Sequence, residues 1–117
     1  MKPAIDRFLP LAPATLHILL SLAGEKMYGY AIMQEVARQS EGRFKLGPGT
    51  LYDNLQRLMK QGLVEEADGR AGDDHPRRRY YRLSGLGRGV LTAEIDRLRG
   101  VVKHAQAHLK PLRPRRT

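Results

Sequence analysis

Apolar residues recur at helical spacing in four stretches of the chain, which predict four helices. The stretches cover residues 13–23, 28–39, 48–61 and 85–109. The first stretch has almost no polar side, so we expect it to be buried nearly all round at the centre of the core. The second and third are apolar on one side and polar on the other, which is typical of helices that cover a core.

Turn-forming residues indicate where the helices begin and end. Pro48 suits the first position of a helix, where its missing N–H costs no hydrogen bond. Gly24 and Gly62 are expected to end the first and third helices, Gly24 as a left-handed cap. Ser84 has a side chain that can cap the last helix. Residues 26–30 are expected to form a turn into the second helix.

Between the third and last helices, the pattern changes to that of a β-hairpin. Residues 63–67 begin a strand, residues 68–76 are turn formers and charged residues, and residues 77–83 return as a second strand. Two helices followed by such a hairpin are typical of a winged helix-turn-helix domain. The sequence therefore predicts a mainly α fold with a small β-hairpin wing, in which the helix over residues 48–61 reads the DNA major groove.

These elements divide the chain into four parts. We expect an N-terminal arm, a winged helix-turn-helix domain that binds DNA, a C-terminal dimerisation helix and a disordered basic tail, at residues 1–12, 13–84, 85–109 and 110–117. The arm carries Ile5, Phe8 and Leu9, and the sequence leaves open whether they dock on the same chain or on a partner.

The charge of the chain favours a polyanionic partner. Lys and Arg total 21 against 12 Asp and Glu, which leaves a formal net charge of +9, and such an excess in a small domain is typical of nucleic-acid-binding proteins. The chain has no cysteine, so disulfides and thiol chemistry are excluded. No signal peptide or membrane-spanning run is visible, so we expect a cytoplasmic protein without a membrane partner.

The polar side of the helix over residues 48–61 holds the residues expected to meet DNA. The candidates for reading base edges are Thr50, Asp53, Asn54, Gln56 and Arg57. Arg57 is also, with Lys60, a candidate for holding phosphates. A solvated polar side is ordinary in an amphipathic helix, so these assignments depend on the place of the helix before the predicted wing.

The predicted wing carries five arginines, against Asp73 and Asp74 in its turn, which leaves a local excess of three positive charges. The arginines are Arg70, Arg77, Arg78, Arg79 and Arg82. A run of arginines is usually a solubilising surface. On a hairpin directly after a recognition helix, however, we expect these residues to contact phosphates or the minor groove.

The last predicted helix has an apolar stripe with alternating steps of four and three residues. Its members are Leu91, Ile95, Leu98, Val102, Ala105 and Leu109. This is the pattern of paired helices, so we predict a homodimer formed through the stripe. Leu86, Val90 and Val101 form a neighbouring stripe that is expected to face the core of the chain itself. The alternative is that both stripes close over one wide core face.

Other motifs are weaker candidates for chemistry. His17 lies in the buried helix and is expected to be a core histidine with a satisfied ring. His104 and His108 are one helical turn apart, but no further ligand completes a metal site. The glycines of residues 85–89 lack the spacing of a nucleotide-binding loop, and close packing or a hinge explains them better. We therefore expect no enzyme, no metal and no cofactor.

Several motifs together resemble the PadR family of bacterial transcription regulators. They are Tyr28-Gly29-Tyr30-Ala31-Ile32, Gly49-Thr50-Leu51-Tyr52, Gly62-Leu63-Val64 and Arg79-Tyr80-Tyr81-Arg82-Leu83-Ser84. Their order and spacing match across residues 16–91. The resemblance implies a winged helix-turn-helix homodimer, paired through its first and last helices, that binds a palindromic operator, usually as a repressor.

The resemblance also implies roles for particular residues. Thr50 and Tyr52 match the recognition-helix residues that approach DNA, and Arg77, Arg78 and Arg79 match the basic wing. Some members release DNA when a small aromatic effector binds near the dimer interface, which makes such a molecule a possible further partner, although this chain has no tryptophan to stack on it. The alternative function is a nonspecific nucleic-acid-binding module, associated with the nucleoid or with RNA.

Overall fold

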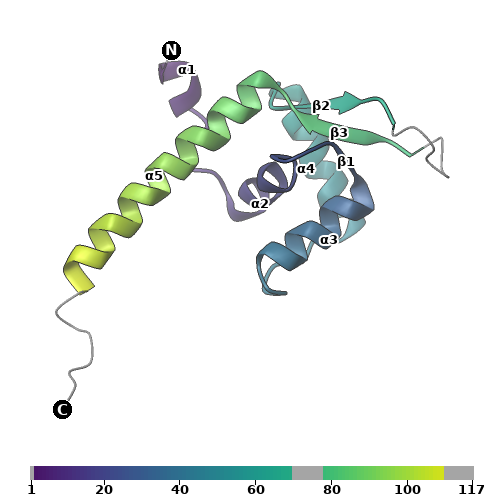
Figure 1. The fold of residues 1–117 in the computed structure, drawn as a ribbon. Coiled ribbons are helices and arrows are strands. Elements are labelled where there is room, and N and C mark those ends of the chain that lie inside the picture. The colour runs from purple at the N-terminus through teal and green to yellow at the C-terminus, as the bar shows by residue number, and fades with distance from the viewer. Residues whose placement is uncertain (1, 70–77, 110–117) are drawn as a thin grey trace.

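The computed structural model describes residues 2–69 and 78–109 (Figure 1). The helices in this part of the chain are α1 (Lys2–Asp6), α2 (Pro13–Ser21), α3 (Gly29–Gln39), α4 (Pro48–Lys60) and α5 (Gly85–Leu109). The strands are β1 (Met27–Tyr28), β2 (Val64–Ala67) and β3 (Tyr80–Leu83). The predicted tail at residues 110–117 and most of the predicted wing turn, at residues 70–77, lie outside the described residues.

The core is built around α2, but the prediction that this helix is buried nearly all round is wrong, because Leu16 and Leu20 are only half-buried. Ile18 and Leu19 of α2, and Leu22 just after it, are buried. The apolar sides of α3 and α4 close over them, with the buried residues Ile32, Val36, Leu51, Leu55 and Leu58. Burying each such side chain stabilises the fold by about 1.5–3 kcal/mol, so this packing fixes the positions of the three helices.

Three of the four predicted helix boundaries are confirmed, and one is wrong. Pro48 starts α4, and Gly62 follows that helix with a left-handed φ of 81°. Ser84 caps α5, because its hydroxyl accepts a backbone hydrogen bond of 2.9 Å. Gly24 is not left-handed: α2 ends before it through a residue in the right-handed region, so the chain needs no left-handed cap there.

The strands form one antiparallel sheet in the order β1-β3-β2. The hairpin of β2 and β3 is the predicted base of the wing. The sequence predicts only a turn at Met27–Tyr28, and the structure corrects this, because these residues pair with Tyr81 and Tyr80 of β3. Two residues are too few to show an alternating pattern, so the strand is visible only through its partner.

The N-terminal arm finds its apolar surroundings within its own chain. Its first residues form α1, which packs beside α5 (Figure 1), and Ile5, Phe8 and Leu9 pack against the buried core. Leu11 N–H then donates a hydrogen bond to Glu94 Oε2 at 3.1 Å. The arm is thereby tied to the long C-terminal helix of the same chain.

The first half of α5 packs on the domain and its second half extends beyond it (Figure 1). Leu91 is 6% exposed, and Ile95 packs against the same core. These two residues therefore pack within their own chain, which corrects the N-terminal end of the predicted dimerisation stripe. The exposed apolar residues of α5 are Leu86, Val101, Val102 and Leu109. Leu86 and Val101 therefore do not face the core, whereas Val90 does.

Candidate nucleic-acid interface

The polar side of α4 lies at the surface of the domain. Its exposed residues are Thr50, Asp53, Gln56, Arg57 and Lys60, with Asn54 half-buried among them. Leu51, Leu55 and Leu58 anchor the opposite side of the helix in the core. The structure thus brings together on one helix all the residues predicted there for reading bases and holding phosphates.

Arg57 is hydrogen-bonded within the domain. Its Nη2 donates to Thr15 Oγ1 at 3.0 Å and to Asn54 Oδ1 at 2.7 Å. Asn54 in turn donates from Nδ2 to the Thr50 carbonyl at 2.9 Å. This series of hydrogen bonds links α4 to the start of α2 and orients the arginine. The Nε and Nη1 donors of Arg57 take no part in these hydrogen bonds, so they can meet a base or a phosphate while Nη2 holds the side chain in place.

Tyr52 lies on the side of α4 that faces α3. Its hydroxyl is in close contact with Gly29, the first residue of α3, and a Cβ placed on Gly29 would lie only 2.8 Å from the Tyr52 ring carbon Cζ. A larger residue at position 29 would therefore force the Tyr52 ring to move. The tyrosine is still 44% exposed, so part of its ring is accessible at the boundary between the two helices.

The wing arginines of β3 and of its entry are paired with acidic residues of the opposite strand. Arg79 Nε donates to Glu66 Oε2 at 2.6 Å, and Arg82 Nε donates to Glu65 Oε2 at 3.0 Å. The hydrogen bond to Glu66 raises the pKa of Arg79. The predicted charge excess neglects both glutamates and is therefore too large, but exposed pairs are weak enough for a phosphate to replace the glutamate. Arg77 lies outside the described residues.

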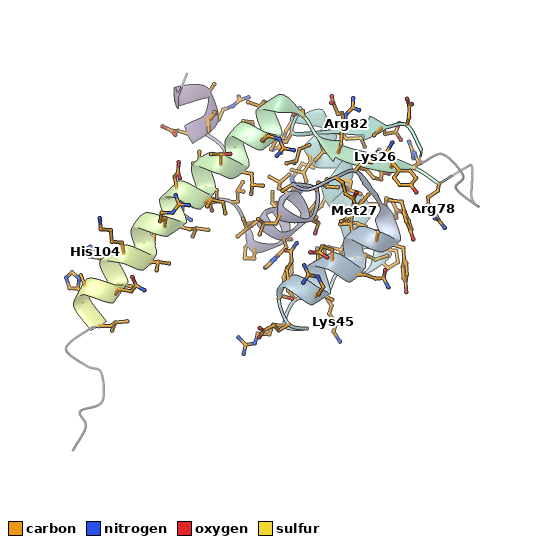
Figure 2. All side chains as sticks on the ribbon, viewed as in Figure 1. Lys26, Met27, Lys45, Arg78, Arg82 and His104 are labelled. Atoms are coloured by element: carbon orange, nitrogen blue, oxygen red, sulfur yellow. The ribbon has the colours of Figure 1, made fainter. Side chains whose placement is uncertain are left out.

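Arg78 and Lys26 lie close to the rings of Tyr28 and Tyr80 at the base of the wing. The guanidinium carbon of Arg78 lies 3.9 Å from the centroid of the Tyr28 ring, and Lys26 Nζ donates to the Asp68 carbonyl at 2.7 Å. The Tyr28 and Tyr80 rings meet edge to face, with centroids 5.6 Å apart. Figure 2 shows Lys26 and Arg78 at this end of the sheet. Sequence periodicity misses Lys26 and Tyr28, because their partners are distant along the chain.

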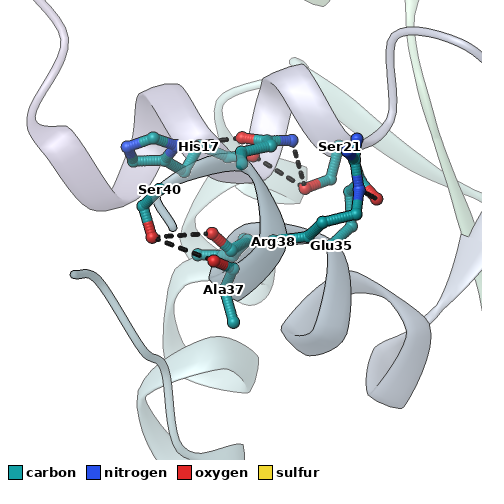
Figure 3. Close-up of polar contacts among 8 residues, drawn as sticks. His17, Ser21, Glu35, Ala37, Arg38 and Ser40 are labelled. Carbon is teal, nitrogen blue, oxygen red and sulfur yellow. Dashed lines mark hydrogen bonds and ion pairs between the residues drawn. The ribbon is translucent and has the colours of Figure 1, made fainter. Parts of the chain in front are cut away.

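A polar network holds α3 against α2 (Figure 3). His17 Nδ1 lies 2.9 Å from Gln39 Oε1, and Gln39 Nε2 donates to Ser21 Oγ at 3.2 Å. The Ser21 hydroxyl donates to the His17 carbonyl at 2.8 Å, and the His17 ring packs against Phe44 with centroids 5.4 Å apart. Nδ1 of His17 thus has a partner, but the side chain is only half-buried, so the prediction of a core histidine is wrong. The network joins α2 to α3 through Gln39.

Residues 2–69 and 78–109 contain neither a metal-binding cluster nor a membrane-spanning helix. No group of three or more His, Cys, Asp or Glu side chains in these ranges is placed to hold a metal ion. The His104 and His108 rings lie 4.4 Å apart on α5, and His108 Nδ1 is 3.0 Å from the His104 carbonyl oxygen. Within the same ranges, no helix combines the length and the apolar character that crossing a bilayer requires.

The segment from α2 to the first half of α5 contains the reading helix and the described parts of the wing. Residues 18–93 match the model of the transcriptional regulator PadR-like family. The chain belongs to this family. PadR-like proteins are transcriptional regulators rather than enzymes, so the expectation that the chain is not an enzyme is confirmed.

Individual proteins are similar to this chain in sequence or in fold. Transcriptional regulator Rv3488 of Mycobacterium tuberculosis is 35% identical over 104 residues, which cover 83% of this chain and 89% of that protein. A PadR family transcription regulator from Clostridium difficile is 24% identical and superposes with a TM-score of 0.70 over 84% of this chain and 99% of its own. Bacillus subtilis PadR, solved in complex with operator DNA, is 19% identical, with a TM-score of 0.62 over 74% of this chain and 48% of its own. The predicted winged-helix fold is thereby confirmed.

Proposed function

We propose that this PadR-like protein is a homodimeric, sequence-specific DNA-binding regulator that represses transcription from a palindromic operator in the cytoplasm. The observation that carries the proposal is the exposed polar side of α4, which the core holds beside a wing that carries arginines. In helix-turn-helix proteins such a helix enters the major groove. Basic residues on a neighbouring element can then hold phosphates or enter the minor groove.

The proposed DNA contacts keep all the residues predicted from the sequence. The residues that read base edges are Thr50, Asp53, Asn54, Gln56 and Arg57, and Tyr52 approaches the DNA beside them. The residues that hold phosphates are Arg57, Lys60, Arg77, Arg78 and Arg79. The formal charge of +9 adds long-range attraction to DNA. A small aromatic effector that releases the DNA is a further part of the proposal, carried over from the family resemblance.

Changing Arg57 to alanine tests the reading helix. We expect Arg57→Ala to weaken binding to a preferred duplex roughly tenfold and to relax the preference at one base pair of each half-site, as loss of an arginine–guanine contact does. Anisotropy titrations against the preferred duplex and single-base variants measure both effects. Arg99→Ala is the control, because it removes an exposed arginine of α5 that pairs only locally with Asp96. If Arg57→Ala keeps wild-type affinity and preference, Arg57 does not belong to the interface.

The proposed dimer uses the second half of α5. The members of the apolar stripe that remain for a partner are Leu98, Val102, Ala105 and Leu109. Val102 and Leu109 are 53% and 56% exposed, and pairing two such stripes removes this surface from water. A dimer of this kind would place two α4 helices roughly 34 Å apart, which is one turn of DNA.

A charge introduced into the stripe tests this dimer. Val102→Asp is expected to raise the dissociation constant of the dimer at least roughly tenfold, because the carboxylate would be buried without a partner. Lys103→Asp is the control, since Lys103 is exposed on a different side of α5. Sedimentation equilibrium measures both variants, and a Val102→Asp protein that dimerises as tightly as the wild type would rule out the stripe as the interface.

A further inference from the structure

Two cationic and two aromatic side chains lie together at the end of the sheet where the wing begins. Lys26 Nζ is 5.8 Å from the centroid of the Tyr80 ring, and the guanidinium carbon of Arg78 is 3.9 Å from that of the Tyr28 ring. Both distances are within reach of cation–π attraction. Tyr28 and Tyr80 are themselves partners in the pairing of β1 with β3, and their rings are in contact. The group therefore links β1, and the residue before it, to β3.

Lys26 also contacts the other strand of the hairpin. Its Nζ donates to the Asp68 carbonyl at 2.7 Å and to the Gly69 carbonyl at 3.3 Å, directly after the end of β2. A lysine ammonium group carries three donors, so it can satisfy both carbonyls at once. Gly69 lies against Tyr80, because a Cβ placed on it would be 3.8 Å from two carbons of that ring. One side chain from the segment before β1 thus contacts both strands of the wing.

The surroundings of Lys26 are those of a supporting residue rather than of a DNA contact. Lys26 is half-buried, whereas Arg79 of the wing is exposed. A hydrogen bond from a charged donor is stronger than one between neutral groups, so Lys26 has little to gain by leaving its two carbonyls. Asp68 and Gly69 directly precede the run of wing arginines in the chain. The direction in which the hairpin carries these arginines therefore depends on the contacts of Lys26.

We infer that Lys26 is a positioning residue for the wing: it holds the hairpin so that the wing arginines meet phosphates while α4 lies in the major groove. Arginines on a hairpin that is already held in place lose less conformational freedom on binding, which strengthens binding without adding a contact. Lys26 acts through these arginines and does not itself touch the DNA. The role in DNA binding rests on the proposed function, whereas the holding of the hairpin does not.

Hydrogen exchange of the full chain, followed by NMR without DNA, tests the holding of the hairpin. Lys26→Met keeps a side chain of similar length and removes the ammonium group. We expect the backbone amides of β2 and β3 to exchange roughly tenfold faster in this variant, because the hairpin opens more often. The amides of α2 should exchange as in the wild type, which shows that the variant is folded. Unchanged exchange in β2 and β3 would overturn the inference.

Anisotropy of a labelled, preferred duplex measures the effect on DNA. Lys26→Met is expected to weaken binding roughly tenfold, and Lys26→Arg, which can still donate to both carbonyls, should stay within about threefold of the wild type. Lys103→Met is the control, because it removes the same charge from an exposed position of α5, and it should bind like the wild type. Wild-type affinity in Lys26→Met, or equal losses in the methionine and arginine variants, would overturn the role of Lys26 in DNA binding.

A double-mutant cycle with Arg78→Gln separates positioning from direct contact. Because Arg78 is one of the residues that Lys26 positions, the double variant should lose clearly less affinity than the two single losses combined. Single losses that combine in full would show that Lys26 meets a phosphate by itself, which would overturn the inference. If the wild type binds no duplex at all, the proposed function fails instead, and hydrogen exchange still tests whether Lys26 holds the hairpin.

Discussion

Replacing Gly87 with alanine is expected to lower the free energy of unfolding by about 2–3 kcal/mol. Gly87 is buried at the start of α5, in close contact with the Leu63 carbonyl oxygen, and a Cβ there would lie only 2.9 Å from the Leu63 carbonyl carbon. Leu63 cannot easily move away from the added methyl group, because it is 1% exposed and its carbonyl accepts a hydrogen bond from Ser84 N–H at 3.0 Å. The added methyl group would therefore push α5 away from the domain.

Gly100→Ala is the matched control, because it makes the same change in the same helix. A Cβ at Gly100 would meet nothing within 4 Å, and alanine in a helix interior is favoured over glycine by up to ~1 kcal/mol. Urea unfolding at one protein concentration should thus show Gly87→Ala below the wild type and Gly100→Ala at or above it. Equal midpoints for the two variants would mean that the contact between Gly87 and Leu63 does not limit how α5 packs.

Replacing Glu94 with glutamine is expected to lower the free energy of unfolding by about 2–3 kcal/mol. Glu94 is 1% exposed, and its carboxylate accepts hydrogen bonds from Arg97 Nε at 2.7 Å, from Arg97 Nη2 at 3.0 Å and from Leu11 N–H at 3.1 Å. Glutamine has no charge to offer Arg97 and only one oxygen for these donors. The substitution therefore weakens the tie between α5 and the N-terminal arm.

Asp96→Asn provides the comparison for Glu94→Gln on the same helix. Asp96 pairs with Arg99 three residues later, as Glu94 does with Arg97, but this pair is exposed to solvent. Exposed pairs of this kind contribute little to stability. We expect urea unfolding to show almost no change for Asp96→Asn, and a similar loss in both variants would show that burial of Glu94 is unimportant.

The role of Glu94 also predicts that the stability of the protein depends on pH. The hydrogen bond from Arg97 holds the pKa of Glu94 below the usual 4.5, although burial acts in the opposite direction. A carboxyl with a lower pKa in the folded state adds stability above its unfolded pKa, and this stability is lost as the pH falls through the folded pKa. The difference in stability between wild type and Glu94→Gln should therefore be constant near neutral pH and shrink below pH 4.5.

The sequence predicts the longer elements of the fold well. Helices α2 to α5 and the hairpin each extend over enough residues for their periodicity to identify them. β1 and α1 are too short for such a pattern. The division of the α5 stripe could not be predicted either, because Leu91 and Val102 are alike in sequence and differ only in whether the domain reaches them.

For the candidate site, the sequence identifies which helix faces outward but not how its side chains are held. The polar side of α4 follows from the buried positions of Leu51, Leu55 and Leu58. The hydrogen bond from Arg57 to Thr15 joins residues that lie 42 positions apart, and no local pattern encodes it. Glutamate is rarely buried in folded proteins, and only the fold shows that Glu94 lies against Leu11.

Selecting duplexes from a random pool with the purified protein, and measuring the mass of the bound complex, tests the central claim. That claim is that two chains pair through α5 and place two α4 helices into successive major grooves. We expect an enriched palindrome with half-site centres about 10 base pairs apart, bound by two chains. A single chain on each duplex, or a pool in which no sequence is enriched, would contradict it and favour a nonspecific nucleic-acid-binding module.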